Sequence, residues 1–153
     1  MSTEKLIIDI VQYLFEAFVF WLYAGIISNQ KRKNSISIPC IIIGYSILLL
    51  VYEFNNLLAT GLSIVVVCTL LFKLFYSMSF KNSLFQSFIL FGVMVGSEFI
   101  SMSIITLITN AAFDIQNISS NVYFADVIVS RLVYFVILII IARLFAKKEN
   151  KDE

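Results

Sequence analysis

The sequence predicts an all-α membrane protein, a polytopic bundle of five transmembrane helices with its N-terminus outside and its C-terminus inside. The chain of 153 residues is 60% hydrophobic, with a mean hydropathy of +0.95. Water-soluble domains are only about half apolar. A spanning helix needs about 20 apolar residues, with a range of about 17 to 25, and five stretches of the sequence qualify. These runs are too long and continuous for barrel strands, so helices must satisfy the backbone in hydrocarbon.

The first three predicted spans cover about residues 6–28, 36–52 and 57–75. The basic run at 31–33 follows the first span and marks a cytoplasmic loop, which places the N-terminus outside. Pro39 falls in the first turn of the second span, where its missing N–H costs little. Asn55 and Asn56 are a turn signal, so the second and third spans are expected to form an antiparallel pair.

The fourth and fifth predicted spans cover about residues 85–108 and 122–145. The loop between them is the longest in the chain and carries no basic residue, as expected for an external loop. The basic residues from Arg143 to Lys148 follow the fifth span, on the same side as the run at 31–33. We therefore expect one transmembrane domain, residues 1–148, followed by a charged cytoplasmic tail, residues 149–153.

The residue types that the sequence lacks narrow its function. It contains no histidine, the commonest metal ligand and general base. Cys40 and Cys68 lie in apolar runs without a Cys-x-x-Cys spacing, so we expect free buried thiols and no metal or redox site. No nucleophile or phosphate-binding loop accompanies the carboxylates, so we expect neither enzyme activity nor a cofactor. A formal charge of +1 gives no basic face for nucleic acid, and the expected partner is the lipid bilayer.

Among the ionisable residues inside the predicted spans, three lie at the same depth: Glu16, Glu98 and Arg131. At a rise of about 1.5 Å per residue, each lies roughly 12 to 15 Å below the outer membrane boundary. An unpaired charge in hydrocarbon costs at least about 2.5 kcal/mol, so we expect Arg131 to pair with Glu98, Glu16 or both in an outward-facing cavity. Three roles stay open: the charges fix only the register of the helices, bind a ligand, or conduct protons or ions.

Helical angles of about 100° per residue separate two faces of the fourth span. Glu98 shares one face with Met94 and Ser101, and Gly92 and Gly96 lie on roughly the opposite side. These glycines form a small-xxx-small pattern, which lets another helix approach closely. We expect that helix to belong to the same chain in preference to a second copy.

Several features in chain order together form a recognisable pattern. They are the first span with its basic exit at 31–33, the Asn55-Asn56 turn, the segment 80–84, Ser97-Glu98, Ser130-Arg131 and the basic exit at 143–148. This pattern resembles the amino-terminal membrane sensor region of agr-type, GHKL-class receptor histidine kinases from low-GC Gram-positive bacteria. The resemblance implies a bundle in the bacterial plasma membrane that detects an extracellular signal, often a secreted peptide. It also implies a homodimer, with Glu98 and Arg131 as candidate ligand contacts.

The phosphoacceptor histidine and the ATP-binding domain of such a kinase are missing from these 153 residues. The resemblance therefore implies a sensor fragment or a stand-alone relative without kinase activity. A small transporter or substrate-binding subunit is an alternative, and it would need access from both sides. A membrane interaction or immunity protein is another, and it would bind its partner through lipid-facing surfaces.

Overall fold

The chain folds into five α-helices in a computed structural model that describes residues 3–28, 34–54, 56–109 and 120–149. They are α1 (Thr3–Ser28), α2 (Asn34–Tyr52), α3 (Leu57–Tyr76), α4 (Phe80–Thr109) and α5 (Ser120–Glu149). The all-α prediction is confirmed. Four helices, α1, α3, α4 and α5, are long and apolar enough to cross a membrane, and the apolar part of α2, Ile36–Tyr52, is shorter. These helices indicate a multi-pass membrane protein.

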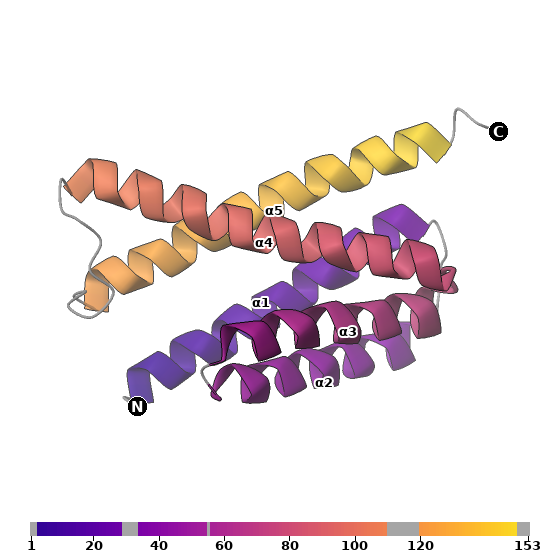
Figure 1. The fold of residues 1–153 in the computed structure, drawn as a ribbon, viewed down its shortest axis with the longest axis horizontal. Coiled ribbons are helices and arrows are strands. Elements are labelled where there is room, and N and C mark those ends of the chain that lie inside the picture. Colours follow the sequence, from indigo (N-terminus) through magenta and orange to yellow (C-terminus); the bar gives the residue numbers. More distant parts are fainter. Residues whose placement is uncertain (1–2, 29–33, 55, 110–119, 150–153) are drawn as a thin grey trace.

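Successive helices run in opposite directions (Figure 1). Their contacts arrange them in a ring. Each packs against its neighbours in the chain, α5 closes the ring on α1, and α1 also reaches α3. Among the described residues, the backbones of α1 and α4 do not come into contact. The start of α1, the turn from α2 to α3 and the facing ends of α4 and α5 lie at one end of the bundle, called here the N-terminal end (Figure 1). The end of α5 lies at the opposite, C-terminal end.

The predicted turn between the second and third spans is present. Asn56 caps α3, since its Oδ1 accepts hydrogen bonds from the backbone N–H groups of Leu58 and Ala59 at 3.1 and 3.2 Å. Such a cap satisfies N–H groups that the first turn of a helix leaves free. Asn55 lies outside the described residues, as do the basic run at 31–33 and the loop 110–119. The prediction that Pro39 lies in the first turn of its helix is wrong, because α2 begins at Asn34 and Pro39 therefore lies in the second turn.

Helices α4 and α5 extend beyond their predicted spans. Ser79 starts α4 early, because its carbonyl accepts from the N–H of Ser83 at 2.9 Å and its hydroxyl from that of Asn82 at 3.4 Å. Helix α5 continues to Glu149, where we had predicted that the charged tail begins, and residues 150–153 are not described. Apolar content thus marks the part of a helix in the membrane and not where the helix ends.

The C-terminal half of the bundle is filled by buried side chains. Phe20 and Phe72 are fully buried and their ring centroids are 4.8 Å apart. Beside them, the Tyr23 hydroxyl donates to Oε1 of Gln86 at 2.5 Å. The fully buried Leu138 of α5 belongs to the same core. A polar cavity lies in the other, N-terminal half of the bundle.

Candidate functional site

A cavity of about 540 Å³ lies in the N-terminal half of the bundle, and all five helices contribute to its wall. Its polar lining includes Gln12 and Glu16 of α1, Glu98 of α4, and Asp126 and Arg131 of α5. Its apolar and aromatic lining includes Tyr13, Tyr52, Phe91, Met94, Phe99, Met102 and Tyr123. The volume falls within the roughly 300 to 1,000 Å³ of sites for small molecules.

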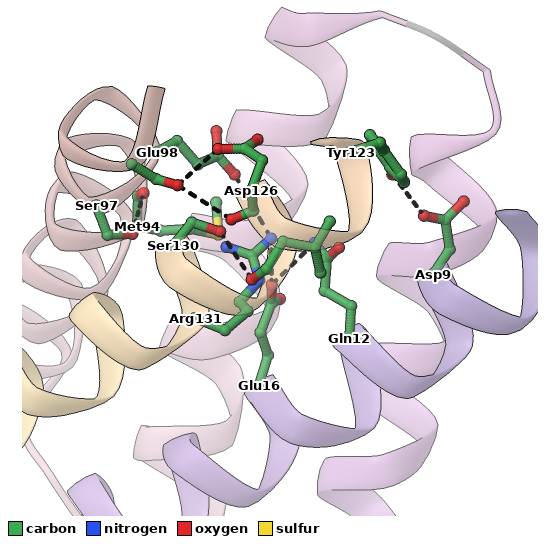
Figure 2. Close-up of polar contacts among 12 residues, drawn as sticks. Asp9, Gln12, Glu16, Met94, Ser97, Glu98, Tyr123, Asp126, Ser130 and Arg131 are labelled. Carbon is green, nitrogen blue, oxygen red and sulfur yellow. Dashed lines mark hydrogen bonds and ion pairs between the residues drawn. The ribbon is translucent and has the colours of Figure 1, made fainter. Parts of the chain in front are cut away.

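The three predicted site residues meet at this cavity (Figure 2). Nη2 of Arg131 lies 3.0 Å from Oε1 of Glu16 and 3.5 Å from Oε1 of Glu98. The side chains of Arg131 and Glu16 are only 9% and 4% exposed, whereas that of Glu98 is 45% exposed. The predicted pairing of Arg131 with both carboxylates is confirmed. Their role in ligand binding stays a prediction.

Arg131 is only partly satisfied by these contacts. A guanidinium carries five N–H donors, and both ion pairs here use the single nitrogen Nη2. Nε and Nη1 are enclosed and have no hydrogen-bond partner among the described residues. Glu16 has a further donor, because Nε2 of Gln12 lies 3.4 Å from the same Oε1 (Figure 2). The protein therefore holds Glu16 firmly and leaves donors of Arg131 unused.

Asp126 is a third carboxylate at the cavity, and sequence reasoning missed it. The hydroxyl of Ser101 lies 2.6 Å from Oδ1 of Asp126 and 3.1 Å from its backbone carbonyl oxygen. This contact ties α4 to α5. The signal was available, since Asp126 precedes Arg131 by little more than one helical turn and is an ionisable residue in an apolar stretch.

Asp9 forms a second polar link between α1 and α5, nearer the N-terminal end. The Tyr123 hydroxyl donates to Oδ1 of Asp9 at 3.2 Å (Figure 2). Tyr13 of α1 lies close to Tyr52 of α2, with ring centroids 6.2 Å apart. Tyr13, Tyr52 and Tyr123 all line the cavity, so aromatic rings from three helices border it.

Gly92 and Gly96 do not lie against another helix in this structure. A Cβ added at either position would meet no atom within 4 Å, apart from the adjoining residues and backbone of its own helix. Close approach occurs instead at Gly44, where an added Cβ would lie 3.1 Å from Val67 of α3, and at Gly61, where it would lie 3.1 Å from Phe91 of α4. The expected packing of the first two glycines within the chain is thus not observed among the described residues.

Comparison of the chain with models of protein families, with curated proteins and with solved structures finds no match. The resemblance to agr-type sensors therefore stays a prediction from the sequence.

Proposed function

We propose that this chain is an integral membrane sensor or receptor module that binds an extracellular signal in the cavity of its N-terminal half. The observation that carries the proposal is the meeting of Glu16, Glu98 and Arg131 in a cavity lined by all five helices. The proposal includes five membrane-spanning helices, an outside N-terminus and a cytoplasmic C-terminus, in a bacterial plasma membrane. It follows the resemblance to the input region of agr-type receptor kinases.

The charge distribution supports this orientation. Lys73, Lys81, Arg143 and Lys147 lie at the C-terminal end of the bundle, and among the described residues only Lys5 is basic at the other end. Basic residues concentrate on the cytoplasmic side of membrane proteins, so the cavity would lie on the outer side.

The length of α2 supports its place as a fifth membrane-spanning helix. Its 19 residues give a length of about 28 Å, close to the roughly 30 Å of a hydrocarbon core.

The cavity is positioned to couple a ligand to the cytoplasmic side. Arg131 of α5 holds Glu16 of α1 and Glu98 of α4, whose backbones do not touch. A ligand that binds Glu98 would compete for its pairing with Arg131 and so change how α4 packs on α5. A ligand shifts a conformational equilibrium only through such differential contacts. Helix α5 would carry the change to the cytoplasmic side, since it continues without a break to Glu149.

The packing favours a sensor over a transporter, which needs access from both sides. Phe20, Tyr23, Phe72 and Leu138 are fully buried and fill the bundle between the cavity and the C-terminal end. Water and ligands would therefore reach the cavity from the outer side alone.

Cysteine labelling tests the access route. In a background with Cys40 and Cys68 changed to Ala, Met102→Cys places a thiol in the cavity wall. Ile100→Cys is the matched control, because Ile100 lies on the same helix, is 43% exposed and is not part of that wall. A membrane-impermeant thiosulfonate is expected to label Met102→Cys from outside only and Ile100→Cys slowly from either side. Equal labelling of Met102→Cys from the cytoplasmic side would favour transport, and no labelling from outside would reject an outward cavity.

A distance measurement tests signalling. Spin labels at Lys81→Cys and Lys147→Cys, in the same cysteine-free background, report on the start of α4 and the end of α5, which both lie at the C-terminal end of the bundle. Addition of a pool of short synthetic peptides to the protein in nanodiscs is expected to shift the distance distribution, and Glu98→Gln is expected to reduce that shift. Accumulation of peptides inside proteoliposomes without a distance change would instead identify a transporter.

A further inference from the structure

The cavity carries an excess of negative charge. Three carboxylates, Glu16, Glu98 and Asp126, line it with a single guanidinium, that of Arg131, which gives a formal charge of −2. Charges in a partly enclosed, low-dielectric space interact more strongly than in water. A ligand with a positive group would therefore be attracted, and an anionic ligand repelled.

Of the three carboxylates, Glu98 is the one that the protein leaves most available. Glu16 is 4% exposed and has both Arg131 and Gln12 as partners. Asp126 accepts a hydrogen bond from Ser101 at 2.6 Å. Glu98 is 45% exposed, and its ion pair to Arg131, at 3.5 Å, is longer than that of Glu16. A carboxylate has about four acceptor positions, so Glu98 can accept a ligand cation, which then competes with Arg131 for this carboxylate.

The unpaired N–H groups of Arg131 indicate that the ligand also carries a hydrogen-bond acceptor. Its side chain is nine-tenths buried and lines the cavity, and Nε and Nη1 have no hydrogen-bond partner in the described part of the chain. Buried donors in native proteins are nearly always paired, so two orphaned nitrogens call for a partner. A small rotation of the guanidinium toward the cavity would present Nη1 to a ligand oxygen while Nη2 stays on Glu16.

The remaining wall suits a cation attached to an apolar body. Tyr13, Tyr52, Phe91, Phe99 and Tyr123 supply aromatic rings, whose faces attract ammonium groups within about 6 Å. Met94 and Met102 add flexible apolar side chains, which adapt to ligands of different shape.

We propose that the cavity recognises an ammonium group next to a carbonyl oxygen, the chemistry shared by amino-acid amides and by the free amino end of a peptide. The ammonium binds Glu98, with Asp126 nearby, and the carbonyl oxygen accepts from Arg131. The apolar side chain beside them packs among the aromatic rings. This inference rests on the proposed function, because it names the ligand class of the same cavity.

Four probes separate the elements of this recognition. Phenylalaninamide carries the ammonium, the carbonyl and a ring. N-acetylphenylalaninamide lacks the ammonium, and 2-phenylethylamine lacks the carbonyl. A tripeptide amide with a free N-terminal phenylalanine continues as a peptide chain. Ligand-observed NMR titrations of the full chain in lipid nanodiscs measure the dissociation constant of each probe.

Phenylalaninamide is expected to bind roughly tenfold or more tightly than its N-acetyl form, because a charge-assisted hydrogen bond is lost on acetylation. The amine without a carbonyl should bind less tightly than phenylalaninamide. Tighter binding of the tripeptide amide than of phenylalaninamide would identify the ligand as a peptide end, and the reverse order would identify a small amine. Equal binding of phenylalaninamide and its N-acetyl form would overturn the proposal.

Paired variants place the binding at the cavity. Glu98→Gln is expected to weaken phenylalaninamide binding roughly tenfold, through loss of the same charge-assisted contact. Glu53→Gln is the matched control, since Glu53 is exposed at the same end of the bundle and does not line the cavity. Equal losses in the two variants would overturn the assignment to Glu98. The absence of any binding to the unmodified chain would also overturn the proposal. Labelling of Met102→Cys from outside tests separately whether the cavity is open to the outer side, whatever ligand it binds.

Discussion

The guanidinium of Arg131 and the carboxylate of Glu98 lie 3.5 Å apart at the cavity, and the carboxylate is 45% exposed while the arginine side chain is 9% exposed. The same arginine nitrogen also holds the buried Glu16 at 3.0 Å. One cation thus serves two carboxylates in different environments. The Arg131–Glu16 pair is buried, so loss of either residue leaves an unpaired charge that water does not solvate. Glu98 is partly exposed, so water in the cavity can solvate its charge when Arg131 is lost.

Arg131→Met is expected to destabilise the protein by about 3 kcal/mol or more, because it leaves Glu16 buried without a counter-charge. Unfolding in mixed micelles with increasing denaturing detergent measures the change. The double variant Arg131→Met with Glu16→Gln should recover much of the loss, since no charge is then left unpaired at that point. A double variant as unstable as the single one would mean that packing of the arginine, and not pairing, is what matters.

Glu98→Gln is expected to change stability by no more than about 1 kcal/mol, since its ion pair is partly exposed. The same detergent titration measures this. Peptide-induced distance changes between the ends of α4 and α5 should nevertheless be reduced. A variant with unaltered response would assign Glu98 to packing alone.

Gly44→Leu is expected to destabilise the bundle by about 1 to 3 kcal/mol through overpacking, because even a Cβ added at Gly44 would lie only 3.1 Å from Val67. Gly92→Leu is the control, since an added Cβ at that position meets no atom within 4 Å. Detergent titration of the two variants compares them. If Gly92→Leu proves as harmful as Gly44→Leu, a second copy or another partner packs on that face, and cross-linking of the unmodified chain would detect it.

The length of the apolar runs predicted the helices well, and local polar contacts decided where they end. The cost of charge in hydrocarbon predicts that ionisable groups gather, which brought Arg131 to Glu16 and Glu98. The same rule applies to Asp126, an ionisable residue in the apolar stretch of Arg131, but its contact with Ser101 of α4 could not be predicted from the sequence. These contacts depend on how α4 is rotated against α5, which the sequence of one helix does not determine.

The glycines show a second limit of sequence patterns. The pair Gly92 and Gly96 has the spacing that permits close helix contact, yet no described helix lies against it. The isolated Gly44 and Gly61 have no such pattern, yet they are the glycines at which an added Cβ would contact a side chain of a neighbouring helix. A small residue permits a neighbouring helix to approach closely. Whether a helix lies next to that residue depends on the order of the helices in the ring.

Phe72→Ala is expected to lower stability by about 3 to 5 kcal/mol, because it removes a fully buried ring from the core that closes the bundle below the cavity. Leu70→Ala is the matched control on the same helix, since Leu70 is 51% exposed on the lipid-facing side and its truncation opens no cavity. Detergent titration gives both values. The space left by Phe72, whose ring lies 4.8 Å from Phe20, should also let the impermeant thiosulfonate reach Met102→Cys from the C-terminal end of the bundle. Stability loss without such access would show that the remaining core, which includes Phe20, Tyr23 and Leu138, keeps the C-terminal half closed.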